Sequence, residues 1–218
     1  MQIIKEVCVD SLIDAICAQK NGADRIELCS RLDLDGLTPE KELIKKTISK
    51  LQIPIRVMIR PHGNGFVYNQ SHLKAMIESI KFCKSLNVDG VVLGCLDSEN
   101  NLDFTQISKL ASIAKPLKVV VHKAIDYSNS VIGSFEKIIQ DPNINGVLSS
   151  GGKQFAKDGL KSLKKMLDLA PNNFEVISAG GITFQNFQII HSILNLILYF
   201  FYLLYFFFSK LLPFKFIS

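Results

Sequence analysis

Several features that would point to a particular cellular role are missing from this 218-residue sequence. No block of basic residues stands out, although Lys and Arg exceed Asp and Glu by 25 to 20, so nothing indicates nucleic-acid binding. The amino-terminal residues have neither the apolar core nor the cleavage pattern of a secretory signal. The five cysteines follow no disulfide framework, no Cys-x-x-Cys pattern and no zinc spacing. These absences favour reduced thiols in a cytoplasmic protein.

The stretch that organises the chain runs from Leu117 to Asp126. A short run of β-branched residues ends abruptly there in His122, Lys123 and Asp126. A buried strand with ionisable groups only at its carboxyl end is typical of a parallel α/β barrel, because barrel sites form at that end. This end of the strands is called the mouth of the barrel below.

Strands alternate with helices along most of the sequence. The predicted strands cover residues 3–9, 24–29, 55–60, 90–95, 117–124, 146–150 and 174–178. Each of the first six is followed by a helical pattern, and connections of this length require parallel strands with right-handed crossovers. Seven such units indicate an α/β fold of the TIM (β/α)₈ type, although periodicity alone leaves an open sheet as an alternative.

The alternation breaks down near residue 187. From Thr183 to Ser209 there is no Lys, Arg, Asp or Glu, and neither an eighth strand nor its amphipathic helix can be recognised. We therefore expect a barrel domain over residues 1–187, incomplete because an apolar tail over 188–218 replaces its last unit. An incomplete barrel would leave strand edges unpaired. The tail is long enough to anchor the chain in a membrane, but its Phe/Tyr/Leu-rich composition favours a faulty gene model.

Ionisable side chains share the inward-facing positions of the first two strands. Because side chains alternate along a strand, Glu6 on the first strand faces the same side as Arg25 and Glu27 on the second. Buried carboxylates need partners, which Arg25, Arg60 or Lys123 could supply. The group forms either an acid–base site at the mouth or a charge network that only fills the barrel.

Cys8 and Cys29 are predicted to lie side by side at the ends of the same two strands. Two thiolates that approach each other in a reducing compartment suit a soft ion such as Cu(I). The alternative is that both are small buried hydrophobic residues, as free cysteines usually are.

Further candidates follow the later strands. His122 could be an acid–base group or a metal ligand, and Asp126 could orient it or bind a cation; the alternative is a hydrogen-bonded histidine at a strand end. Arg60 is suited to bind an anion at any pH. Gly180 and Gly181 resemble a barrel phosphate cradle, although the same glycines also form ordinary turns.

Several motifs taken in order carry a family resemblance. They are Asn21-Gly22-Ala23-Asp24-Arg25-Ile26-Glu27-Leu28-Cys29, Gly36-Leu37-Thr38-Pro39, Ile59-Arg60-Pro61, His122-Lys123-Ala124-Ile125-Asp126, Ser149-Ser150-Gly151-Gly152 and Ala179-Gly180-Gly181. Over residues 2–187 the chain resembles the CutC copper-homeostasis proteins. The resemblance implies a (β/α)₈ barrel, a cytosolic role in copper handling, and Cu(I) binding.

The sequence departs from that family in three places. Lys123 stands where the family usually has Arg, which removes a bidentate fork for a carboxylate or phosphate. His62 and Gly65 replace an Arg and an Asp in the loop after Arg60, which weakens an anion site there. The family's last strand and carboxyl-terminal helices are replaced by residues 188–218.

Two functions are compatible with these residues. The leading hypothesis is a copper-homeostasis protein that binds Cu(I) through Cys8 and Cys29 at the mouth. The rival is a barrel enzyme acting on a small anionic or phosphorylated substrate. It assigns anion binding to Arg25, Arg60, Lys123, Gly180 and Gly181, and acid–base catalysis to Glu6, Glu27, His122 and Asp126.

A third interpretation is that the chain is a non-functional truncated product. Substrate and homo-oligomer formation are left open, and a membrane is a partner only if the tail is genuine.

Overall fold

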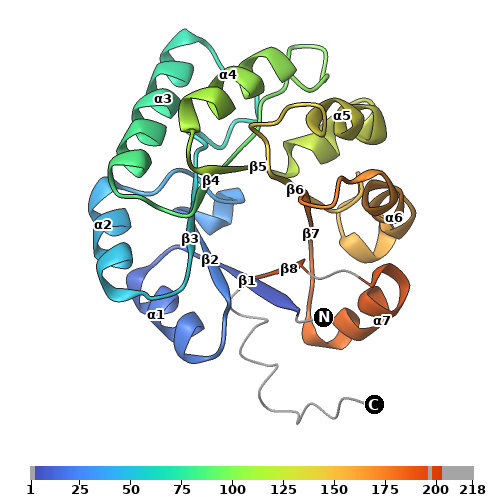
Figure 1. Cartoon of the computed structure of the whole chain (residues 1–218), viewed down its shortest axis with the longest axis horizontal. Coiled ribbons are helices and arrows are strands. Elements are labelled where there is room, and N and C mark those ends of the chain that lie inside the picture. The colour runs from blue at the N-terminus through green and yellow to red at the C-terminus, as the bar shows by residue number, and fades with distance from the viewer. Residues whose placement is uncertain (1–2, 196–197, 203–218) are drawn as a thin grey trace.

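The chain folds into a closed barrel of eight parallel strands, numbered in sequence order around the barrel. A computed structural model describes residues 3–195 and 198–202, and Figure 1 shows its helices arranged outside the strands. The strands are β1 Ile4–Val9, β2 Arg25–Leu28, β3 Ile55–Met58, β4 Gly90–Leu93, β5 Lys118–Val121, β6 Gly146–Ser149, β7 Glu175–Ser178 and β8 Leu198–Tyr202. The helices are α1 Leu12–Lys20, α2 Lys41–Lys50, α3 Gln70–Ser85, α4 Phe104–Ala114, α5 Val131–Ile138, α6 Leu160–Leu169 and α7 Phe184–Leu194. The TIM-type α/β fold predicted from the sequence is confirmed.

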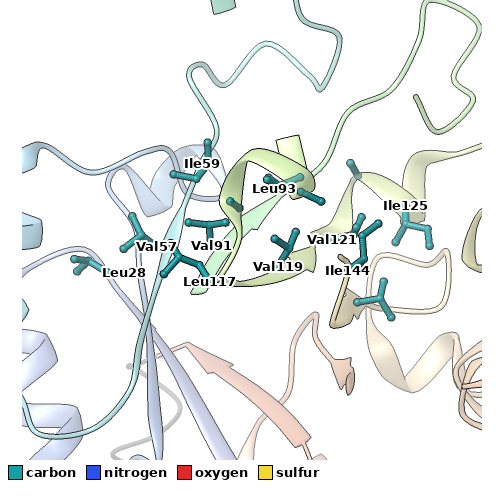
Figure 2. Close-up of a cluster of buried hydrophobic side chains, with 14 of the residues drawn as sticks. Leu28, Val57, Ile59, Val91, Leu93, Leu117, Val119, Val121, Ile125 and Ile144 are labelled. Atoms are coloured by element: carbon teal, nitrogen blue, oxygen red, sulfur yellow. The ribbon is translucent and has the colours of Figure 1, made fainter. Parts of the chain in front are cut away.

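Side chains alternate along each strand between two hydrophobic cores. The larger core lies between the strands and the helices, and Figure 2 shows part of it, with Val57, Val91 and Val119 from three neighbouring strands. The next residues along β4 and β5, Val92 and Val120, belong to the second core inside the barrel. This second core is small and includes Cys8 and Cys29.

The local sequence explains where several helices begin and end. Ser11 accepts a hydrogen bond from the backbone N–H of Asp14 and caps α1. Gly22, just beyond the end of α1, has a φ of 87°, which glycine adopts without strain. Asn69 and Thr183 begin α3 and α7 with capping boxes. These boundaries place the loops after each strand at the mouth of the barrel.

The eighth strand corrects the expectation of an incomplete barrel. β8 lies within the apolar segment and pairs with β1 over Ile4↔Leu198 to Cys8↔Tyr202, and with β7 at Ser178↔Tyr199. No alternation marks β8 in the sequence, because both of its faces are buried in apolar surroundings. Figure 1 shows β8 beside β1, where it closes the barrel.

The segment assigned to the tail therefore contains part of the barrel. α7 runs through residue 188, and β8 follows it. The remaining residues of the expected tail, 203–218, lie outside the described residues, as do 196–197. Within the described ranges, none of the helices combines the length and the apolar character needed to cross a membrane.

Candidate functional site

A network of buried charges occupies the interior at the amino-terminal ends of the strands. Arg25 opens β2 and donates from Nε and Nη2 to Oε2 of Glu6, at 2.8 and 2.6 Å. Glu175 opens β7 and pairs with Arg25 at 3.0 Å and with Arg56 at 2.7 Å. The sequence placed Glu6 and Arg25 at the mouth, but they lie away from it. They belong instead to the charge network that was the alternative interpretation, and each charge is already paired. Strand alternation predicts the face of a side chain but not its depth in the barrel.

The two predicted cysteines and Glu27 form one buried cluster nearer the mouth. Cys8 Sγ lies 3.5 Å from Cys29 Sγ, and Oε1 of Glu27 lies 3.7 and 3.4 Å from the two sulfurs. The three ligand atoms all lie within 4.8 Å of one another. Each residue is at most 2% exposed. We call this group the Cys8–Glu27–Cys29 cluster.

The surroundings hold this cluster in its neutral, protonated form. Burial and the charge of Glu6 raise the pKa of Glu27 to about 8, against the hydrogen bonds from Cys29 and Cys8 that lower it. The hydrogen bond with Cys29 lowers the pKa of Cys8, but burial and the charges of Glu27 and Glu6 outweigh it and raise the pKa to about 11. The hydrogen bond with Cys8, together with burial, raises the pKa of Cys29 well above its ordinary value. A soft cation that binds both sulfurs must therefore displace their protons.

His122 and Asp126 serve separate structures at the mouth. Nδ1 of His122 accepts a hydrogen bond from the N–H of Ala124 at 3.2 Å. Burial and the charge of Arg60 lower the pKa of His122 to about 3, so the ring is neutral and Nε2 carries its hydrogen. Asp126 instead accepts hydrogen bonds from Ser149 Oγ, from both the amide and the hydroxyl of Ser150, and from the Gly152 amide. The Asp126 carboxylate is thus engaged in holding the turn after β6.

Arg60 follows β3 and its side chain is buried at the mouth, with the residue 5% exposed. Its Nη1 donates to the carbonyl oxygens of Leu34 at 2.6 Å and Gly36 at 3.2 Å. The guanidinium carbon lies 4.7 Å from the centre of the Phe66 ring. In the part of the chain that the structure describes, no carboxylate lies within ion-pair distance of Arg60.

Lys123 and the predicted glycine cradle come together on the other side of the mouth. A Cβ added to Gly180 would lie 3.2 Å from Nζ of Lys123 and 3.0 Å from the carbonyl oxygen of Gln154. A Cβ on Gly181 would lie 2.6 Å from the Phe155 ring. Both glycines have positive φ, 98° and 64°, so the turn needs glycine for its conformation and for its close packing. Their role in anion binding stays a prediction.

Sequence reasoning missed three polar residues of the interior. Arg56 and Glu175 are the partners of Glu6 and Arg25, and the alternation of Arg56 with Met58 and Arg60 could have placed Arg56 inside. The third is Tyr68, a loop residue that is 5% exposed, and no strand pattern could have identified it.

The chain was compared with known proteins by sequence and by structure. The sequence model of the CutC family matches residues 3–196. A human relative, named copper homeostasis protein cutC homolog, is 36% identical over 185 residues, which cover 85% of this chain and 67% of the human protein. A CutC family protein of Pasteurella multocida is 34% identical over 181 residues, which cover 83% of this chain and 74% of that protein.

Solved structures support the same assignment. The CutC protein from Streptococcus agalactiae superposes with a TM-score of 0.85 at 30% identity, covering 91% of this chain and 98% of that one. A thiamine phosphate pyrophosphorylase from Pyrococcus furiosus, at 14% identity and a TM-score of 0.62, covers 92% of this chain and 85% of that one. It shares the fold alone. This chain, a closed parallel barrel with a buried dithiol, belongs to the CutC family.

Proposed function

We propose that this protein takes part in copper homeostasis by binding Cu(I) through Cys8 and Cys29, with Glu27 as the neighbouring third donor. The observation that carries the proposal is the buried Cys8–Glu27–Cys29 cluster, whose three ligand atoms lie within 4.8 Å of one another. Thiolates are soft ligands that select Cu(I) over harder cations. The names of the relatives, which refer to copper homeostasis, support the same ligand.

The surroundings of the two thiols suit capture of a monovalent ion. The thiols and the Glu27 carboxyl are neutral near pH 7, so the metal-free cluster carries no charge that would need hydration. Binding through both sulfurs releases two protons to solvent, because the Glu27 carboxyl beside them already carries its own proton. All five cysteines are free thiols, which supports a reducing, cytoplasmic location.

An anaerobic titration of the reduced full chain with Cu(I), in competition with bicinchoninate, tests the proposal. We expect one tightly bound ion per chain in the wild type and loss of that binding in the Cys8→Ser/Cys29→Ser variant. The matched control is Cys17→Ser/Cys83→Ala, which also removes two thiols but from the helices α1 and α3, and should bind as the wild type does. Unchanged affinity in Cys8→Ser/Cys29→Ser would overturn the assignment.

A second candidate function is catalysis on a small anionic substrate, favoured by the buried charge of Arg60, which has no acidic partner among the described residues. Among the predicted acid–base groups, Glu27 has a pKa of about 8, which suits proton transfer near neutral pH. A screen of small carboxylates and phosphate esters with the purified chain tests this function. Turnover that is lost in Glu27→Gln would support it, and the absence of any turnover would count against it.

A further inference from the structure

Arg60 carries a buried charge that meets no acidic side chain in the part of the chain the structure describes. The chain has four arginines, and Arg25, Arg31 and Arg56 each pair with a carboxylate. Arg60 contacts backbone carbonyl oxygens and the Phe66 ring instead. A buried guanidinium is costly unless a negative charge balances it. The described part of the protein does not supply that charge, so a ligand is the natural source.

One edge of the Arg60 guanidinium is available to such a ligand. Its Nε is buried and has no hydrogen-bond partner among the described residues. The adjacent Nη2 makes one long contact, 3.5 Å, with the carbonyl oxygen of Gly63. In Arg31 the same edge binds both oxygens of Asp33, at 2.8 and 2.6 Å. The free edge of Arg60 therefore has the shape that grips an oxyanion through two hydrogen bonds.

Two further buried polar groups lie near Arg60. Within the described ranges, neither Nε2 of His122 nor the hydroxyl of Tyr68 makes a hydrogen bond of ordinary length and angle. The charge of Arg60 lowers the pKa of His122 further than burial does alone. Burial raises the pKa of Tyr68, and the charge of Arg60, together with a weak hydrogen-bonding interaction between Arg60 and the Tyr68 hydroxyl, opposes that rise. The Phe66 ring contacts both the Arg60 guanidinium and, at 5.1 Å between ring centres, the His122 imidazole.

The buried atoms that lack good hydrogen-bond partners among the described residues can all donate a hydrogen bond. Nε of Arg60 and Nε2 of His122 are donors, and the Tyr68 hydroxyl can donate. Leaving buried donors unpaired costs free energy, so their convergence at the mouth indicates an absent acceptor. Glycine at position 94 leaves room for the His122 ring, because a Cβ there would lie 2.7 Å from Nδ1 of His122 and would displace the ring.

We propose that Arg60, Tyr68 and His122 form a binding site for a small oxyanion, a carboxylate or a phosphate group, at the ends of β3 and β5. The anion receives two hydrogen bonds from the free edge of Arg60 and one each from Tyr68 and His122. It supplies the negative charge that Arg60 lacks. The site is distinct from the Cys8–Glu27–Cys29 cluster, and binding there requires no copper.

The experiment measures anion binding by the full-length, copper-free chain. Thermal unfolding and isothermal titration are followed with inorganic phosphate and, separately, with acetate, at constant ionic strength maintained with sodium chloride. We expect saturable stabilisation by at least one of them. Tighter binding of phosphate assigns a phosphorylated ligand, and tighter binding of acetate assigns a carboxylate. No saturable binding of either anion would overturn the proposal.

Variants locate the binding and separate it from folding. Arg60→Met should abolish it, whereas Arg31→Met, which removes an exposed arginine, should leave it unchanged. Because Arg60 also holds two loops, Tyr68→Phe is the decisive variant. Among the described residues its hydroxyl loses only the weak interaction with Arg60, so the free chain should be nearly as stable as the wild type. Its anion affinity should fall about tenfold. Wild-type affinity in a folded Tyr68→Phe chain would refute the site.

Discussion

Glu27→Gln should stabilise the protein at alkaline pH, by an amount that follows from the burial of Glu27. The native pKa of about 8 lies above the ordinary value of 4.5. Between these values the folded chain keeps a proton that the unfolded chain loses, so the wild type loses stability as pH rises through this window. At about 1.4 kcal/mol per pH unit, the full loss over three units would be about 4.2 kcal/mol; because titration is incomplete near both pKa values, the loss between pH 5 and pH 8 is about 3.5 kcal/mol. Glutamine has nearly the same shape and no proton to lose, so the variant should escape this loss.

Urea unfolding of the wild type and of Glu27→Gln at pH 5 and pH 8 measures the effect. The change in unfolding free energy between the two pH values is compared between the two chains, so that the titration of all other carboxyl groups cancels. The matched control is Glu136→Gln on the exposed surface of α5, which should follow the wild type at both pH values. If Glu27→Gln shows the same change of unfolding free energy between pH 5 and pH 8 as the wild type, then Glu27 is ionised in the folded protein. The account of a neutral cluster would then be wrong.

Three other predictions concern the metal, the mouth and the closing strand. Cu(I) affinity should rise about hundredfold per pH unit between pH 6 and 8, because both thiols must lose protons. Competition with a chelator measures this affinity, and a rise of only about tenfold per pH unit would mean that a single sulfur binds. Asp126→Asn should lower the unfolding free energy by about 1–3 kcal/mol, since it weakens four hydrogen bonds; an unchanged urea midpoint would contradict this. Phe200→Ala removes a buried ring inside the barrel and should cost about 3–5 kcal/mol. A wild-type melting temperature would argue against closure by β8.

The fold could be predicted because its periodic signals are local. Seven strands end in polar residues and alternate with helices, and that pattern requires no knowledge of distant contacts. β8 could not be recognised, because a strand buried on both faces between apolar neighbours reads as a uniform hydrophobic run. Its pairing with β1 and β7 becomes visible only in the three-dimensional structure.

The candidate site could be predicted in part for the same reason. Alternation placed Cys8 and Cys29 on one inward face, and the structure brings their sulfurs to 3.5 Å. Depth inside the barrel depends on the stagger between strands, which the sequence does not reveal, so Glu6 and Arg25 were expected at the wrong end. The surroundings of Arg60 also escaped prediction, because Tyr68 reaches it from an irregular loop.

The pairing of β1 with β8 has a consequence for the order of events during synthesis. β1 leaves the ribosome long before β8, so one of its edges has no neighbour until Leu198–Tyr202 has been translated. Contacts between such distant segments form slowly, because a long loop must close first. Cys8, Glu27 and Cys29, by contrast, all lie between the start of β1 and the residue that follows β2. The two thiols are therefore synthesised long before the strand that closes the wall around them, and the open edge of β1 must avoid incorrect pairing during that interval.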